Sequence, residues 1–308
     1  MSKTLDRREV LGIGAAASIG MTLAKSASAQ ESAKSPKTVR VGMIGVGGRG
    51  TGLLRLLASM EGVQFPAVCD INAKAAERAQ DIVEKSGRPK PEAYTKGDTH
   101  YKDLIARDDL NAVVIATPWE WHTPMAVDGM KAGKYVGVEV PAAMTMEECW
   151  DLVKTSEATG VPCMMLENWS FRRDNLAVLN MIRQGLFGEI VHCHCAHSHN
   201  CMHWYFDREG QPRWSAEHLA RRNCDLYPTH SLGPVLSWMD INCGDRFDYL
   251  TATATRPLGV KLQLAEKFGP DHPVLKREFA HGDIITSVVK TVKGNTLVIN
   301  NDMQLPRP

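Results

Sequence analysis

Three side chains suited to acid–base chemistry stand where expected strands end or expected helices begin. Tyr227 and His230 lie within one helical turn in Tyr-Pro-Thr-His. Phenol and imidazole groups at this spacing suit proton transfer, and an imidazole works near neutral pH without a large pKa shift. Glu139 closes an apolar run in Val-Glu-Val-Pro. We predict His230, Tyr227 and Glu139 as catalytic residues; a structural histidine and an exposed strand-terminal carboxylate are the alternatives.

A glycine-rich turn follows the first apolar run, residues 39–44. Gly45-x-Gly47-x-x-Gly50 leads from this expected strand directly into an expected helix, 51–60. The first glycine permits a tight turn, the second lets the backbone approach a pyrophosphate, and the third lets the helix pack closely on the strand. Unpaired N–H groups at the helix start favour phosphate. The order predicts a dinucleotide-binding turn, and a glycine-rich surface loop is the alternative.

An acidic residue stands where the adenosine ribose of a dinucleotide needs one. A second apolar run, residues 65–69, ends at Asp70, 20 residues after Gly50. A carboxylate there accepts hydrogen bonds from the ribose hydroxyls and repels a 2′-phosphate. This position favours NAD over NADP.

Aromatic residues and a histidine follow another buried run, residues 112–116. They form Trp119-Glu120-Trp121-His122. In open α/β sheets, ligands bind at the carboxyl ends of the strands. We expect Trp119 and His122 to stack on or hydrogen-bond the cofactor, and aromatic packing at a plain helix start is the alternative.

A run rich in His and Cys, residues 192–203, invites interpretation as a metal site. On a strand, its histidines and cysteines alternate between the two faces. The first two cysteines are one residue apart, and such pairs rarely close a tetrahedral zinc site, for which wider spacings are usual. We therefore predict no metal and expect polar substrate contacts from His197 or His199.

The order of expected elements predicts two domains. Strands and helices alternate over residues 38–168, which predicts a doubly wound parallel sheet of the Rossmann type. Residues 169–308 show longer strands and fewer helices, which predicts an α+β domain with a mostly antiparallel open sheet. The chain stops at Pro308 directly after an expected strand, so we expect a C-terminally truncated second domain. The strands expected there are 190–196, 248–255, 283–292 and 296–301, and the helices are 175–184 and 228–238.

Composition limits the class of protein. The 308 residues are 44% hydrophobic and 23% charged, which is ordinary for a globular chain. The formal net charge of +1 argues against a nucleic-acid binder, which would need a basic surplus. The eight cysteines show no tandem C-x-x-C pattern, and we expect most of them to be small buried hydrophobic residues.

The N-terminus has the pattern of an export signal. Arg7 and Arg8 precede the uncharged stretch 10–24, and Ala-Ser-Ala at 27–29 fits a cleavage site. We expect a twin-arginine-like signal over 1–29, a linker over 30–37 and a periplasmic location. The stretch is too short for a spanning helix, so we expect no membrane span after signal removal.

Taken together, these motifs resemble glycoside hydrolase family 109, the NAD-dependent α-N-acetylgalactosaminidases of the glucose–fructose oxidoreductase and inositol dehydrogenase (Gfo/Idh/MocA) superfamily. The resemblance is carried by residues 119–122, 139–140, 165–168, 172–174, 223–230 and 238–242. It implies NAD contacts from ten residues: Gly48, Arg49, Asp70, Trp119, Glu120, Trp121, His122, Glu139, Val140 and Asn168. It also implies a sugar site lined by Tyr227, Pro228, Thr229 and His230.

The chain departs from these relatives at three positions. Val140 stands where the dehydrogenases of the superfamily usually have a lysine that assists hydride transfer, which argues against a simple sugar dehydrogenase. His197 stands where the family commonly has Tyr. Arg213-Trp214 reverses the usual Trp-Arg order. The last two departures touch substrate binding.

The resemblance implies a reaction as well. A terminal α-N-acetylgalactosaminide or related α-glycoside would be oxidised transiently at C3 by NAD, undergo elimination, add water and be re-reduced. His230 and Tyr227 would share the proton transfers, and Glu139 would position the C3 hydroxyl. The alternatives are an NAD-dependent sugar dehydrogenase that releases NADH and a non-catalytic sugar-binding protein. The expected partner is a small glycoside, and the family is compatible with a homo-oligomer.

Overall fold

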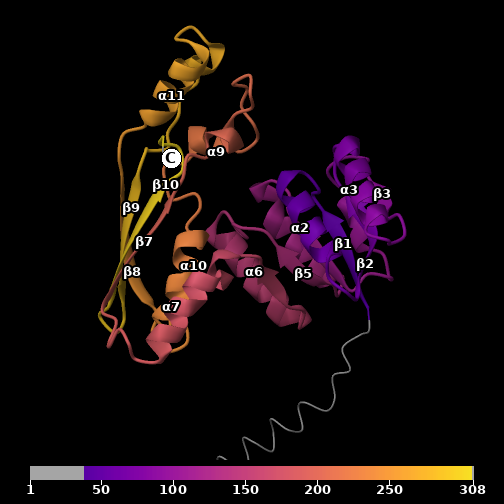
Figure 1. Cartoon of the computed structure of the whole chain (residues 1–308), viewed down its shortest axis with the longest axis horizontal. Helices are drawn as coiled ribbons and strands as arrows, with labels where there is room; N and C mark the ends of the chain where they lie inside the picture. The colour runs from indigo at the N-terminus through magenta and orange to yellow at the C-terminus, as the bar shows by residue number, and fades with distance from the viewer. Residues whose placement is uncertain (1–37, 307–308) are drawn as a thin grey trace, which may run out of the picture.

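The computed structural model describes residues 38–306, which form two lobes side by side (Figure 1). The expected signal, residues 1–29, and the linker that follows it lie outside the described residues. Within the described part of the chain, no helix is long and apolar enough to cross a membrane.

The first lobe is built on a six-stranded parallel sheet with the order β3-β2-β1-β4-β5-β6. The predicted doubly wound sheet is thus confirmed, although the short edge strand β3 was not expected. The strands are β1 (Val39–Ile44), β2 (Val63–Cys69), β3 (Glu92–Tyr94), β4 (Ala112–Ile115), β5 (Tyr135–Val138) and β6 (Cys163–Met165).

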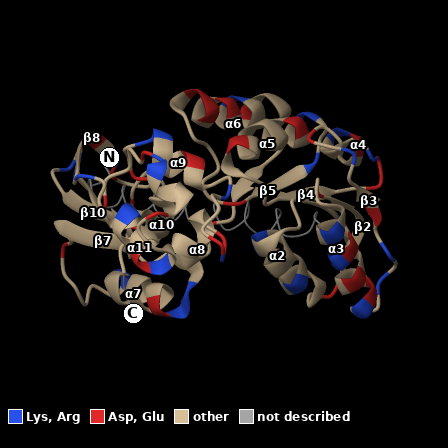
Figure 2. Cartoon of the chain, turned by 90° about the horizontal axis from the view of Figure 1, so that it is seen from above, with Lys and Arg blue, Asp and Glu red and all other residues tan. Residues whose placement is uncertain are grey.

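Helices cover both faces of this sheet (Figure 2). One face carries α2 (Gly48–Ala58) and α3 (Ala73–Lys85), and the other carries α4 (Tyr101–Ile105), α5 (His122–Lys131) and α6 (Met146–Thr159). Two of the helices begin at side-chain caps. The side chain of Asn72 accepts a hydrogen bond from the backbone N–H of Lys74, and Thr145 and Glu148 form a capping box.

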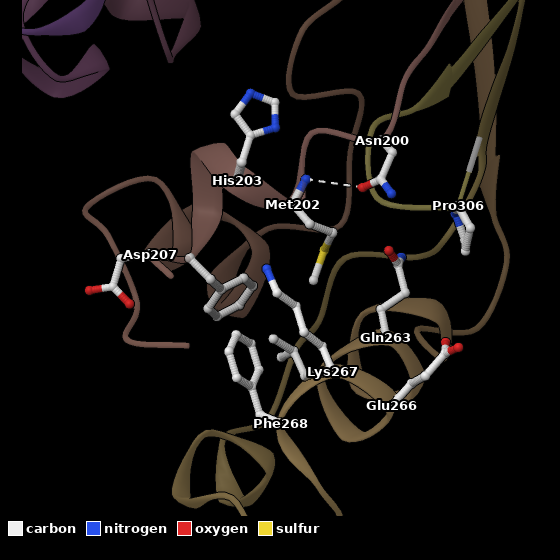
Figure 3. A pocket seen from close by; sticks show the side chains of 11 residues that line it. Asn200, Met202, His203, Asp207, Gln263, Glu266, Lys267, Phe268 and Pro306 are labelled. Atoms are coloured by element: carbon white, nitrogen blue, oxygen red, sulfur yellow. Dashed lines mark hydrogen bonds between the residues drawn. The ribbon is translucent and has the colours of Figure 1, made fainter. Parts of the chain in front are cut away.

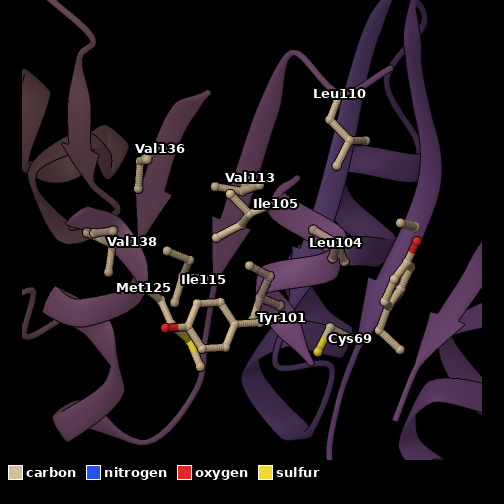
Figure 4. Packing of buried hydrophobic residues seen from close by; sticks show 14 of the residues in the cluster. Cys69, Tyr101, Leu104, Ile105, Leu110, Val113, Ile115, Met125, Val136 and Val138 are labelled. Atoms are coloured by element: carbon tan, nitrogen blue, oxygen red, sulfur yellow. The ribbon is translucent and has the colours of Figure 1, made fainter. Parts of the chain in front are cut away.

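Alternation along the strands builds the two cores of the lobe. On β4, Val113 and Ile115 point toward α4 and α5, while Ala112 and Val114 point toward the α2 side. Figure 4 shows Met125 and Val138 beside Ile115, and Leu104 belongs to the same cluster. Burying a leucine fully contributes roughly 1.5–3 kcal/mol, so these clusters hold the strand ends in place.

The second lobe contains a four-stranded sheet with the order β7-β10-β9-β8. Its strands are β7 (His192–Ser198), β8 (Phe247–Ala254), β9 (Ile285–Thr291) and β10 (Thr296–Asp302). Only β7 and β10 pair in parallel, which confirms the mostly antiparallel prediction. Helices α7 (Arg173–Arg183) and α10 (Thr229–Trp238) pack against one another, and α10 lies on β7.

Six helical elements were not predicted from the sequence. They are the 3-10 turns η1 (Trp119–Trp121), η2 (Trp169–Phe171) and η3 (Pro273–Lys276), and the helices α8 (Met202–Tyr205), α9 (Ala216–Arg221) and α11 (Gly259–Phe268). Most are too short to show helical periodicity. A single apolar cluster contains Trp119 and Val140 of the first lobe together with Tyr205, Leu219 and Tyr227 of the second. This cluster fixes the two lobes against each other.

The expectation for the cysteines was wrong in part. All eight are free, but only Cys69 and Cys201 are buried, whereas Cys149, Cys224 and Cys243 are exposed. Cys149 illustrates the reason, because no residue of α6 is buried in this structure.

Candidate functional site

The glycine turn has the geometry that its spacing predicted. Gly45 has a φ of +79°, and a Cβ there would lie 2.7 Å from the backbone of Ala116. A Cβ on Gly50 would overlap the carbonyl oxygen of Gly45. These two glycines let α2 start tightly against β1. By contrast, a Cβ on Gly47 or Gly48 would meet open space.

That open space is part of a hollow of about 220 Å³ at the carboxyl ends of β1, β2 and β4. Asp70 lines it, with its carboxylate held by the backbone N–H of Val46 at 2.9 Å and of Asn72 at 2.8 Å. Trp121 of the first lobe and Trp214 of the second line it as well. A glycine cradle at a helix start beside a strand-end carboxylate fits a dinucleotide. The predicted cofactor residues that line the hollow are Gly45, Gly47, Gly48, Asp70 and Trp121.

The Trp-Glu-Trp-His stretch is divided among different surroundings. Trp119 is buried away from the hollow, with its ring stacked on His218 at 4.8 Å. Glu120 is exposed and lies 3.7 Å from the same histidine. His122 is buried, and its ring nitrogens lie 2.7 Å from the carbonyl oxygen of Pro141 and 2.8 Å from that of Thr117. Burial lowers the pKa of His122. Its imidazole therefore links two strand ends rather than facing the hollow.

Glu139 connects β5 to the glycine turn. One carboxylate oxygen lies 2.5 Å from Nε of Arg49, and the other accepts the backbone N–H of Val140 at 3.0 Å. The Glu139 side chain is buried and that of Arg49 is half exposed. A cation and a carboxylate predicted to contact the cofactor therefore pair across the start of α2. Val140 is buried in the cluster between the lobes.

Three residues predicted for the sugar site come together in the second lobe. The Tyr227 and His230 rings are 4.9 Å apart, and His197 on β7 lies 5.5 Å from Tyr227 and 5.2 Å from His230. His199 adjoins His197 at 4.6 Å. Burial, together with the nearby charge of Glu139, raises the pKa of Tyr227, so its phenol keeps its proton at neutral pH. Burial and the adjacent histidines lower the pKa of His197 to about 4.

A carboxylate that we did not single out from the sequence completes this group. Glu167 lies between β6 and η2, and its Oε1 is 2.7 Å from Nδ1 of His230. Both side chains are buried. The signal available in the sequence was weak: Glu167 follows a strand, as Asp70 and Glu139 do, but it lies 63 positions from its partner.

The other predicted sugar-site and cofactor residues lie elsewhere. Pro228 and Thr229 line a hollow of about 420 Å³ beside α6, together with Met144 and Met165. Asn168 is exposed at the start of η2. In Tyr-Pro-Thr-His the outer two residues thus face the histidine group, and the inner two line a separate hollow.

A further hollow of about 520 Å³ lies between α8 and α11 (Figure 3). Asp207, Gln263 and Lys267 are among its lining residues, and it contains none of the predicted site residues. Among residues 38–306, no group of three or more His, Cys, Asp or Glu side chains is arranged to hold a metal ion.

Family comparisons agree with the two-lobe division. Residues 39–167 match the family model "Oxidoreductase family, NAD-binding Rossmann fold", and residues 171–308 match "Glycosyl hydrolase 109, C-terminal domain". A glycosyl hydrolase family 109 protein of Shewanella baltica is 43% identical over 99% of this chain and 70% of its own length. An α-N-acetylgalactosaminidase of Shewanella oneidensis is 45% identical over 88% of this chain and 60% of its own length.

Solved structures share the fold at low identity. Scyllo-inositol dehydrogenase of Lactobacillus casei, with bound NAD(H) and scyllo-inositol, superposes with a TM-score of 0.65 at 15% identity, covering 87% of this chain and 71% of its own. An NAD-binding oxidoreductase of Klebsiella pneumoniae gives a TM-score of 0.68 at 21% identity, covering 89% and 68%. The predicted fold class and the NAD cofactor are confirmed.

Proposed function

This chain belongs to glycosyl hydrolase family 109, and from that premise we propose that it is an NAD-dependent glycosidase acting on terminal α-N-acetylgalactosaminide or related α-glycoside bonds. The observation that carries the proposal is the buried group of Tyr227, His230 and Glu167. Tyr227 and His230 belong to the second lobe, and Glu167 lies where the chain passes from the first lobe to the second, between β6 and η2. The apolar cluster that contains Tyr227 also contains Val140, the residue after Glu139. Proton-transfer groups are thus placed beside the NAD-binding lobe.

The role of each group in the reaction follows from its chemistry. Bound NAD would supply reversible oxidation at C3 of the sugar, which would make elimination at C1, water addition and re-reduction a redox-neutral hydrolysis. His230 accepts and returns the proton at C2, because a neutral imidazole is a base near neutral pH. Tyr227 serves as a hydrogen-bond donor to the sugar, because burial keeps its phenol protonated at neutral pH. Glu139, held by Arg49, positions the C3 hydroxyl.

A panel of aryl glycosides tests this proposal. Purified protein is incubated with α- and β-linked aryl sugars while the released phenol and the absorbance of NADH are both recorded. We expect phenol release with no net growth of the NADH band. Growth of that band with each turnover would instead identify the dehydrogenase alternative.

The His230→Ala variant tests the base. His230 does not line the hollow at the glycine turn, so we expect NAD to remain bound in this variant. Turnover should fall by about 10²–10⁴-fold. Retention of full activity would exclude His230 as the base.

We also propose that residues 1–29 direct export to the periplasm by the twin-arginine route, as their pattern indicates. The test is fractionation of a bacterial host that expresses the whole chain. Replacing Arg7 and Arg8 together by lysine should retain the protein in the cytoplasm, whereas unchanged export would contradict the proposal.

A further inference from the structure

We propose that Glu167 is a positioning residue that fixes the imidazole of His230, with its proton on Nδ1 and Nε2 left as the proton acceptor. This inference rests on the proposed function, in which His230 moves a substrate proton. It concerns a residue that hydrogen-bonds Nδ1 of His230.

The carboxylate of Glu167 is itself held rigidly. Oε1 accepts the backbone N–H of Trp169 at 2.7 Å, and Oε2 accepts the backbone N–H of Ser170 at 2.8 Å and its hydroxyl at 2.5 Å. Burial alone would raise the pKa of Glu167, but the hydrogen bonds from His230, Ser170 and the backbone outweigh it and hold the pKa below its ordinary value. The group is therefore an ionised, acceptor-only partner at neutral pH.

This partner determines which ring nitrogen of His230 is protonated. An ionised carboxylate 2.7 Å from Nδ1 can only accept, so Nδ1 must donate. A neutral imidazole has one N–H, and Nε2 is then left with a free lone pair. In a neutral ring of the opposite tautomer, Nδ1 would present its lone pair to an anion inside the protein, which is strongly unfavourable.

The ring plane of His230 is fixed as well. Trp169 stacks on it at 5.3 Å with an interplanar angle of 22°, and the guanidinium of Arg172 lies 4.8 Å from the centre of the Trp169 ring. The same short turn, η2, therefore supplies both the N–H donors that hold Glu167 and the indole that holds His230. A hydrogen bond and a stacking contact together leave the imidazole little rotational freedom.

The approach of α10 to this turn depends on Gly233. A Cβ there would overlap the hydroxyl of Ser170 and lie 2.5 Å from Oε2 of Glu167. Gly233 lies one helical turn after His230 on the same face, so its missing side chain makes room for the carboxylate. The absence of a side chain at Gly233 on α10 thus matches the position of the Glu167 carboxylate beside η2.

The first test needs no variant of Glu167. In ¹⁵N-histidine-labelled protein with NAD bound, the His230 signals are identified by their loss in His230→Gln, and the two nitrogen shifts are read above the pH at which the ring loses its charge. We expect a protonated Nδ1 and an unprotonated Nε2. A neutral ring with its proton on Nε2 overturns the inference.

The second test compares Glu167→Gln with the exposed control Glu157→Gln on α6. Loss of the charged acceptor should lower kcat by about 10²–10³-fold, since misoriented or wrongly protonated catalytic histidines lose this much or more. KM and NAD retention should stay within twofold of wild type, because Glu167 contacts Nδ1 of His230 and does not line the hollow at the glycine turn. The control should match wild type. A Glu167→Gln enzyme with kcat within threefold of wild type overturns the inference.

Misfolding and failure of the proposed function give different results. If Glu167→Gln does not retain NAD, Ser170→Ala is the second variant, because it removes one hydrogen bond to Glu167 and leaves the carboxylate in place. Ser170→Ala should lower kcat by about threefold to tenfold at unchanged KM. An unchanged kcat counts against a positioning role for Glu167. If the wild-type enzyme releases no phenol from any aryl glycoside, the proposed function fails, and the nitrogen shifts still decide whether Glu167 fixes the tautomer of His230.

Discussion

Gly233→Ala is the sharpest test of the site, because helix propensity predicts that the substitution stabilises the protein, whereas packing predicts that it destabilises the protein. Gly233 lies inside α10, where alanine in place of glycine normally stabilises a helix by about 1 kcal/mol. Here the added methyl would overlap the Ser170 hydroxyl and press on Oε2 of Glu167 at 2.5 Å. Both atoms are tied into the network around His230 and cannot move without breaking hydrogen bonds.

The magnitudes decide which effect wins. Forcing a methyl group into a packed site costs about 1–3 kcal/mol, and displacing a charge-assisted hydrogen bond costs roughly a further 1.5–3 kcal/mol. Set against the gain of about 1 kcal/mol in helix propensity, the net effect is a loss of about 1.5–5 kcal/mol in the free energy of unfolding. Because the displaced group is Glu167, kcat should fall by at least about tenfold.

Gly52→Ala is the matched control. Gly52 lies inside α2, is exposed, and would place a Cβ in open space, so the same substitution should stabilise by about 0.5–1 kcal/mol. Urea unfolding of the NAD-loaded protein measures both variants, and phenol release measures their activity. If Gly233→Ala is as stable as Gly52→Ala and fully active, the packing argument around Glu167 is refuted.

Three further predictions follow from the same structure. Because the fold favours the neutral ring of His197, the stability that this ring contributes is complete above pH 6.5 and is lost as the pH falls toward 4. In urea unfolding, the wild-type protein should therefore lose up to about 3 kcal/mol more stability over this pH range than His197→Phe loses. Buried Asp225, whose pKa burial raises to about 6, gives the opposite trend in both proteins, so its contribution cancels in the comparison. Asp70→Asn should weaken NAD binding about tenfold and narrow the preference over NADP, and a fluorescence titration with both nucleotides that finds neither change would contradict the assigned role. His122→Phe should lower stability by about 1–3 kcal/mol, because it removes the one N–H that a neutral imidazole donates to the carbonyl oxygen of Thr117 or Pro141, yet NAD affinity should be kept. A large loss of NAD affinity in the same titration would show that the ring faces the cofactor.

The cofactor half of the site was predictable because its determinants are local. Gly45, Gly50 and Asp70 act through the backbone of one strand, one turn and one helix start, and the structure places them as their spacing predicts. The aromatic stretch after β4 was less predictable. Its residue types indicated contact with a ligand, but the direction of each ring depends on η1 and on the lobe that packs against it, so only Trp121 faces the hollow.

The sequence by itself determined the parallel sheet, the dinucleotide turn and the identity of the groups able to move protons. These depend on hydrophobic periodicity, on glycine geometry and on side-chain chemistry, all of which act over a few consecutive residues. Only the tertiary structure decided that Glu167 meets His230 across 63 positions, with Trp169 stacked on the ring and Gly233 making room. Such a contact depends on how α10 packs against η2, and that packing is a property of the assembled lobes rather than of either segment alone.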